Sequence, residues 1–255
     1  MIFEISFHLV ALLMLAAFLA GLVDSIAGGG GLITVPALLL AGADPVTALA
    51  TNKLQGSFGS GTATWAYARA GHVRLRDQAG MGLVALIGGA AGAMVAHLIP
   101  AAALRIIMPV ILVGIAAFFA LKPGLSDADR VQRMAPGLFT ATVVPLIAGY
   151  DGFFGPGTGS FFMLAFVMLA GFGVLKATAH TKLLNFASNI GSLAVFAAGG
   201  AIWWKVGLAM AAAQTAGAAL GARLAMRVGA RLIKPLLVIT STGMALRLIW
   251  QVWMG

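Results

Sequence analysis

The chain has 255 residues, of which 61% are hydrophobic and 9% are charged, and its mean hydropathy is +1.01. A soluble domain carries roughly 25% charged residues, so this composition excludes a soluble globular protein and indicates an integral membrane protein. The formal net charge of +9 comes from basic residues in short loops, which indicates membrane topology rather than nucleic-acid binding. Because the chain has no cysteine, disulfides, thiol catalysis and thiolate metal sites are excluded.

Ten apolar segments are predicted as helices, and most reach the ~20 residues that a spanning helix needs. In chain order they are 6–27, 30–42, 46–69, 78–98, 104–121, 134–150, 157–172, 176–199, 206–227 and 232–253. The second and the seventh are short, and each follows a glycine-rich break, at 28–31 and 155–159. Such breaks free backbone groups, which is tolerated only inside protein or beside a water-filled cavity. No basic stretch precedes the first segment, so we expect it to remain as a helix rather than a cleaved signal peptide.

Each glycine-rich break has an aspartate before it and a lysine after it. This shared order indicates that the chain contains two copies of one unit. At an offset of 127, three residues of the first copy match the second: Asp24, Gly28 and Gly30 meet Asp151, Gly155 and Gly157. At an offset of 129, eight more match: Lys53, Leu54, Gly71, Met81, Gly88, Gly92, Ala96 and Gly114 meet Lys182, Leu183, Gly200, Met210, Gly217, Gly221, Ala225 and Gly243. A sequence rich in glycine and alanine produces matched glycines by chance, but it hardly produces a matched aspartate and a matched lysine as well. We predict two membrane repeats, 1–125 and 126–255.

The distribution of basic residues predicts how the two copies are oriented. If all ten segments cross, one face collects eleven: Arg69, Arg74, Arg76, Lys122, Arg130, Arg133, Lys176, Arg223, Arg227, Arg231 and Lys234. The other face keeps Arg105, Lys205 and Arg247, so the positive-inside rule places the N-terminus outside the cytoplasm. Five spans per copy make the copies inverted, as in many secondary transporters. The alternative, in which the short segments do not cross, gives eight spans and parallel copies and divides the basic residues less cleanly.

Each copy carries a lysine some seven residues inside an apolar segment, about 10 Å along a helix that rises 1.5 Å per residue. In the second copy Lys182 shares one helix face with Thr178, Asn185, Asn189 and Ser192. A polar stripe with one positive charge suits the path of a small anion, whereas the alternative reading is hydrogen bonding between helices. The first copy is less regular: Lys53, Ser57, Ser60 and Thr64 share a face, with Asn52 and Gln55 beside it.

The two aspartates lie just before the breaks. Each carboxylate is a candidate to exchange protons, to hold a cation, to pair with a lysine of either copy, or to cap the short helix that follows. The breaks themselves place free amide groups and a positive helix end at membrane depth, which favours an anionic ligand. His180, two residues before Lys182, titrates near neutrality in its unperturbed form, although a lone histidine is more often a hydrogen-bonded spacer.

Several functions are disfavoured by missing motifs. The chain contains no G-x-x-x-x-G-K-[ST] sequence, so an ATP-driven motor within it is not expected. No Ser-His-Asp or H-E-x-x-H arrangement supports an intramembrane hydrolase, and the histidines lack metal-ligand spacing. We therefore expect no enzyme, no cofactor and no metal.

The glycine-rich break after an acid, Thr51-Asn52-Lys53, and Thr181-Lys182 with Asn185 and Asn189 together resemble the sulfite exporter TauE/SafE family, also called the toluene-sulfonate uptake permeases. The resemblance covers almost the whole chain. It implies a carrier of the bacterial inner membrane whose substrate is sulfite, a sulfonate or a related sulfur-containing anion. The polar stripe departs from symmetry, because Gly56 and Ser60 stand where Asn185 and Asn189 stand in the second copy.

The hypothesis is a secondary transporter that moves a small sulfur-containing anion by alternating access; the alternative is an anion channel or passive pore. The expected partners are that anion and membrane lipid, with no nucleic acid, and a homodimer is left open. The expected substrate-binding residues are Lys53, Lys182, Asn52, Gln55, Thr51, Thr181, Asn185, Asn189, Gly29, Gly30 and Gly157. The candidates for ion coupling are Asp24, Asp151 and His180.

Overall fold

The structure is a computed structural model that describes residues 7–100, 102–104, 128–129 and 131–229. These residues form helices and loops, with no strand among them. The helices are α1 (Phe7–Ala27), α2 (Gly31–Leu40), α3 (Pro45–Arg69), α4 (Ala79–Leu98), α6 (Pro136–Leu138), a π-helical turn η1 (Phe139–Val143), α7 (Val144–Phe153), α8 (Thr158–Met168), α9 (Val174–Ala198) and α10 (Trp204–Val228). Eight of the ten predicted segments correspond to these helices. The predicted segments 104–121, apart from its first residue, and 232–253 lie outside the described residues.

The start of α3 shows how local sequence fixes a helix boundary. Asp44 precedes the helix, and its carboxylate accepts hydrogen bonds from the amides of Val46, at 3.1 Å, and Thr47, at 3.2 Å. Pro45 occupies the first helical position, where the missing amide hydrogen costs nothing. The apolar run that precedes the lysine therefore begins its helix three residues after the glycine turn at Gly42.

Two described helices are long and apolar enough to cross a membrane by length and composition: α1, with hydropathy 2.4, and α4, with hydropathy 1.8. The helices α2 and α8 have 10 and 11 residues. At 1.5 Å per residue each is about 15 Å long, half of the ~30 Å hydrocarbon core. Ten membrane crossings, with the short segments 30–42 and 157–172 among them, stay a prediction.

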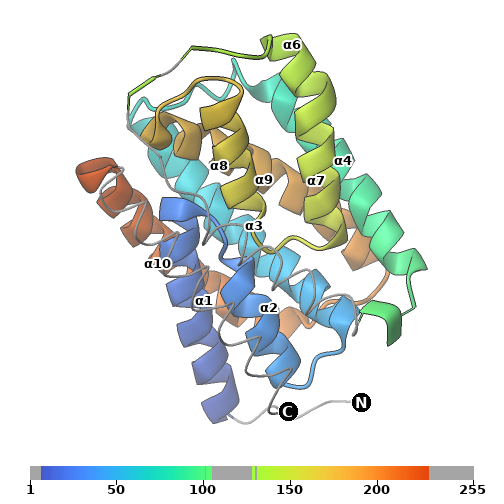
Figure 1. Cartoon of the computed structure of the whole chain (residues 1–255). Coiled ribbons are helices and arrows are strands. Elements are labelled where there is room, and N and C mark those ends of the chain that lie inside the picture. The colour runs from blue at the N-terminus through green and yellow to red at the C-terminus, as the bar shows by residue number, and fades with distance from the viewer. Residues whose placement is uncertain (1–6, 101, 105–127, 130, 230–255) are drawn as a thin grey trace, which may run out of the picture.

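Helix α2 folds back along α1. Gly30 packs against Ala20 and Asp24 near the end of α1, while Leu38, near the end of α2, lies in one hydrophobic cluster with Leu13 and Ala17. Figure 1 shows the same arrangement for α7 and α8, which enter from the opposite end of the molecule.

Each main contact between a helix of one half and a helix of the other has a counterpart in which the two halves change roles. Helix α1 packs on α10 and α7 packs on α4; α3 packs on α10 and α9 packs on α4; α3 and α9 contact each other. In the predicted alignment α7 matches α1, α9 matches α3 and α10 matches α4, so each pairing is the counterpart of another. In Figure 1, α1 and α7 run in opposite directions, as do α3 and α9. These features are expected of an inverted duplication; the repeat boundary at 125–126 lies outside the described residues and stays a prediction.

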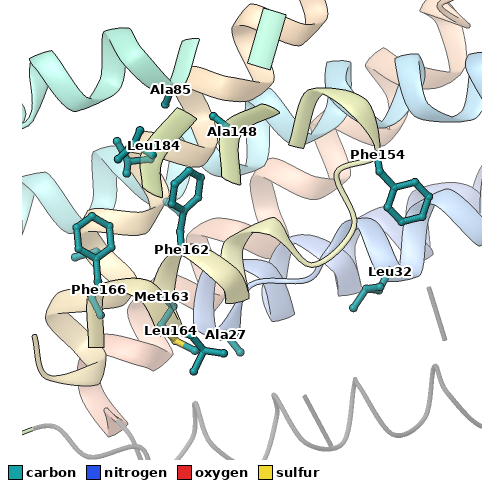
Figure 2. Packing of buried hydrophobic residues seen from close by; sticks show 14 of the residues in the cluster. Ala27, Leu32, Ala85, Ala148, Phe154, Phe162, Met163, Leu164, Phe166 and Leu184 are labelled. Atoms are coloured by element: carbon teal, nitrogen blue, oxygen red, sulfur yellow. The ribbon is translucent and has the colours of Figure 1, made fainter. Parts of the chain in front are cut away.

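Glycines let the helices of opposite halves approach closely. A Cβ added at Gly92 of α4 would lie 1.9 Å from the carbonyl oxygen of Gly149 in α7, and one added at Gly217 of α10 would lie 2.0 Å from that of Phe18 in α1. Small residues at a helix interface allow the two backbones to approach in this way. The main hydrophobic cluster also joins both halves: Figure 2 shows Leu32 of α2 with Phe154, Phe162 and Leu184 of the second half.

Candidate functional site

The two glycine breaks lie against each other at the centre of the molecule. A Cβ added at Gly28 would lie 2.3 Å from the amide nitrogen of Ser160, and the Ser160 hydroxyl donates a hydrogen bond of 2.9 Å to the carbonyl of Ala27. Four glycines in the breaks have positive φ values of 81–94°: Gly28, Gly29, Gly155 and Gly157. This region of backbone conformation favours glycine. The breaks can therefore turn sharply and touch only because these positions have no side chain.

A small polar cavity of about 30 Å³ lies where the breaks meet. Its lining residues come from both halves: Asp24, Gly29, Gly30, Gly31, Asn52, Gly56, Asp151, Gly155, Gly157, Thr158, Gly159, Asn185, Asn189 and Gln214. A cavity needs about 10–15 Å³ for one water, so this one has room for a group of a few atoms. The first residues of α2 and of α8 are in the lining, so the positive ends of both helices lie at the cavity.

The lysine of each half pairs with the aspartate of the other half. Lys53 Nζ lies 2.8 Å from Asp151 Oδ1, and both side chains are buried. The contact is therefore a buried ion pair between the two halves. Asp151 also accepts a hydrogen bond of 2.5 Å from the Ser188 hydroxyl of α9. The Asp151 carboxylate is thus fixed from α3 and from α9.

The second pair is the counterpart of the first. Lys182 Nζ lies 3.2 Å from Asp24 Oδ2 and also donates to the backbone carbonyl of Asp24. The other carboxylate oxygen of Asp24 accepts the amide of Gly30 at 3.1 Å, next to the start of α2. Asp24 therefore forms the ion pair with a lysine that the sequence left as one alternative, and it also holds the amide of the glycine that precedes α2, although no side chain caps that helix.

Neither lysine is in the cavity lining. The ammonium groups lie directly behind two glycines that are: Lys53 Nζ is 2.8 Å from the position of a Cβ on Gly155, and Lys182 Nζ is 3.5 Å from that on Gly159. Asp24 and Asp151 are among the lining residues. The two negative groups are therefore closer to an occupant than the two positive ones, an arrangement that the sequence did not indicate.

Three predicted asparagines line the cavity. Asn52 Oδ1 accepts hydrogen bonds from the Thr34 hydroxyl, at 2.6 Å, and from Gln55 Nε2, at 3.1 Å. Asn189 Nδ2 donates to Asn185 Oδ1 at 3.3 Å, and the Asn189 amide lies 3.6 Å from a Cβ position on Gly56. The glycine that breaks the symmetry of the stripe thus leaves room for an amide of the opposite helix.

Other predicted site residues lie outside the lining. Thr51 accepts a hydrogen bond from the amide of Trp203, and Gln55 supports Asn52 from behind. The Thr181 hydroxyl is buried without a hydrogen-bond partner. His180 lines a separate cavity of about 340 Å³ with His72, Arg74 and Gln78, so the structure does not bring it together with the two aspartates.

The sequence reading missed Gln214 of α10. Its side chain lines the cavity, its Nε2 lies 2.6 Å from a Cβ position on Gly59, and its Oε1 is buried without a partner. The available signal was a single amide in the middle of an otherwise apolar predicted helix. Gly31, Gly155, Thr158 and Gly159 were also missed as individual residues, although the breaks that contain them were singled out.

A sequence model described as "Sulfite exporter TauE/SafE" matches residues 13–248. The chain is 55% identical over 258 residues to "Probable membrane transporter protein ORF9" of Sinorhizobium sp, which covers 99% of both chains. It is 45% identical over 250 residues to "Probable membrane transporter protein YfcA" of Escherichia coli strain K12, covering 98% of this chain and 93% of that one. A "Probable membrane transporter protein" of Haemophilus influenzae is 43% identical over 248 residues and 97% of both chains. No solved structure matches the chain.

Proposed function

We infer the substrate and the mechanism of this membrane transporter from its family, because the chain belongs to the sulfite exporter TauE/SafE family. The substrate is a small sulfur-containing anion such as sulfite or an organosulfonate, and it crosses by alternating access. The observation that carries the proposal is the central cavity, where two glycine breaks, two helix N-termini and three asparagines converge. Amide groups and positive helix ends are suited to an oxyanion.

In this proposal the anion occupies the cavity between the halves. The amides of Asn52, Asn185, Asn189 and Gln214 and the backbone of Gly29, Gly30 and Gly157 contact its oxygens. Lys53 and Lys182 supply positive charge from behind Gly155 and Gly159. Gln55 supports this set through its hydrogen bond to Asn52, whereas Thr51 and Thr181 lie outside the cavity lining. Asp24 and Asp151 are the candidates for ion coupling; His180 is less suited, because it lines a different cavity.

The size of the cavity supports a carrier over the alternative of an anion channel. A cavity of about 30 Å³ holds a group of a few atoms and is bounded by side chains and backbone of both halves. A pore would need a continuous wide path, whereas a carrier alternately exposes a closed site. Two inverted repeats that rock against each other would open the cavity first to one side and then to the other.

The membrane is proposed to be the bacterial inner membrane, with the N-terminus in the periplasm because of the bias of basic residues. The chain acts as a carrier rather than as an enzyme in this proposal. A homodimer is compatible with it, because the proposed site is built within one chain.

A thermal-shift screen of the purified protein tests the substrate class. Sulfite, sulfate, methanesulfonate and acetate are compared at equal ionic strength, because a bound anion stabilises the fold according to its occupancy. The proposal expects sulfite or methanesulfonate to raise the melting temperature more than acetate does. Equal shifts for all four anions would exclude a sulfur-oxyanion site.

A further inference from the structure

The buried charges of the described residues sum to zero. Among the residues that the structure resolves as buried, the charged ones are Asp24, Lys53, Asp151 and Lys182, two of each sign. All four surround the cavity or lie directly behind its wall. Burying a net charge in a medium of low dielectric constant is strongly unfavourable, so a balanced set is stable as it stands. A monovalent anion that enters this set alone leaves one negative charge uncompensated.

The position of the carboxylates makes the imbalance worse. Asp24 and Asp151 line the cavity, and each lysine is already paired with one of them. An entering anion therefore meets two carboxylates before it meets a free ammonium group. Neutralising one carboxylate removes the repulsion and releases the positive charge of its lysine, so that the loaded cavity again has a net charge of zero.

The two pairs are not equivalent. Lys53 and Asp151 lie 2.8 Å apart, the Asp151 side chain is 2% exposed, and Ser188 also donates to it. Lys182 and Asp24 lie 3.2 Å apart, and the Asp24 side chain is 12% exposed. Lys182 also donates to the backbone carbonyl of Asp24, so it keeps one partner when the carboxylate is neutral. A neutral Asp24 is thus better tolerated than a neutral Asp151.

The groups that face Asp24 come from four helices or their ends. Lys182 approaches from α9 and the Gly30 amide from α2. Tyr67 approaches from α3, where its hydroxyl donates to the carbonyl of Ser25. From α10, the neutral amide of Gln214 shares the cavity. Within the described part of the chain, Lys182 is therefore the charged partner that decides which form Asp24 takes.

We propose that the transported anion crosses together with a proton and that the carboxylate of Asp24 carries this proton. A proton from water on the loading side adds to Asp24 Oδ2, Lys182 keeps its charge, and the anion binds beside the released ammonium group. On the other side the anion leaves, the proton returns to water and the ion pair forms again. The exchange is electrically neutral for a monovalent anion. This inference rests on the proposed function and identifies its coupling ion.

Proteoliposomes loaded with a fluorescent pH indicator test the inference with methanesulfonate, a strong-acid anion that carries no proton of its own, and with sulfite. With methanesulfonate, a gradient of one pH unit, acidic outside, is expected to drive about tenfold accumulation, because one pH unit corresponds to a factor of ten for one proton per anion. Uptake should acidify the interior, and a valinomycin-imposed potassium potential should leave its rate unchanged. Uptake that follows the potential or a sodium gradient would overturn the inference.

The variant Asp24→Asn removes the titratable group and keeps the shape of the side chain. It is expected to lower the ratio of protons to anions from about one to zero, which makes the remaining uptake sensitive to potential. Asp129→Asn, which removes an acid of an exposed pair outside the cavity lining, is the matched change, for which the ratio is expected to stay at about one. A ratio of one proton per anion in Asp24→Asn would overturn the role of Asp24. If a variant does not fold, the ratio measured for the wild-type protein still tests whether the anion crosses with a proton.

Exchange of external for internal anion needs no net proton movement, so it separates the two proposals. If the protein exchanges anions but a pH gradient drives no accumulation, proton coupling is rejected and the proposed anion carrier is retained. If neither methanesulfonate nor sulfite is exchanged, the proposed function is rejected, and the proposed proton coupling is rejected as well.

Discussion

Asp24 of α1 and Lys182 of α9 belong to opposite halves of the chain, and their charged atoms lie 3.2 Å apart beside the central cavity. The corresponding residues, Asp151 of α7 and Lys53 of α3, lie 2.8 Å apart. Each half therefore supplies the acid for one pair and the base for the other. Each buried charge has its partner in the other half, so the halves depend on each other for stability as well as for the site.

The first prediction concerns the Lys53–Asp151 pair. Lys53→Met removes the positive charge and leaves Asp151 buried without it, so we expect the free energy of unfolding to fall by about 3–5 kcal/mol. The double variant Lys53→Met/Asp151→Asn has no uncompensated charge at this pair and should lose less than the sum of the two single changes. Denaturant unfolding in detergent measures all four states of the cycle.

The exposed pair of Lys176 and Asp129 is the control, since their side chains are 45% and 59% exposed. Lys176→Met should change the free energy of unfolding by about 0–1 kcal/mol. Strict additivity in the Lys53–Asp151 cycle would show that the two buried groups do not stabilise each other.

A second prediction tests the asparagine lining. Asn189→Ala removes an amide from the cavity, and we expect sulfite affinity to weaken about tenfold or more, as for the loss of one hydrogen bond to a charged group. The sulfite-induced rise in melting temperature measures this loss. Thr178→Ala, on the same helix and outside the lining, removes a hydroxyl that has no hydrogen-bond partner and should keep the full shift. If both variants respond to sulfite alike, the cavity is not the binding site.

A third prediction concerns close packing between halves. Gly92→Ala places a Cβ 1.9 Å from the carbonyl oxygen of Gly149, so α4 and α7 must separate, at about 1–3 kcal/mol or more. Gly80→Ala, on the same helix, meets nothing within 4 Å and should be neutral or gain up to about 1 kcal/mol from helix propensity. Thermal unfolding of the two variants makes the comparison; a more stable Gly92→Ala protein would contradict the described packing.

A fourth prediction uses pH and a residue outside the membrane-spanning segments. The amide of Gly173 donates to Asp129 at 2.6 Å and Lys176 pairs with it, and these contacts lower the pKa of Asp129 below its ordinary 3.8. Because the folded pKa is below the unfolded one, the stabilisation is present above about pH 4 and is lost as the pH falls through the folded pKa. Asp129→Asn should therefore lower the melting temperature slightly near neutral pH and have a smaller effect near pH 3. An effect that grows toward low pH would reverse this assignment.

The sequence was sufficient for the features that depend on local composition. Glycine and proline mark the breaks, apolar runs mark the helices, and aspartate and lysine stand out because charge is rare in the chain. The asparagines on the Lys182 face were found because helical spacing places them on one side. These residues line the cavity in the structure.

The features that the sequence did not predict depend on tertiary packing. The sequence left open whether Asp24 pairs with Lys53 or Lys182, because the choice depends on how α1, α3, α7 and α9 cross. The return of α2 and α8 depends on positive φ values at four glycines, which composition alone does not reveal. Gln214 was missed because its counterpart in the first copy is Ala85, so the repeat gave no signal there.

Counterflow in proteoliposomes is the most direct test of the central claim that a small sulfur-containing anion binds in the cavity and is carried across. Vesicles preloaded with sulfite should take up labelled sulfite faster than empty ones, and Lys53→Met and Lys182→Met should each reduce that uptake strongly. Uptake that is independent of internal sulfite would indicate a pore, and unchanged counterflow in both lysine variants would contradict the site itself.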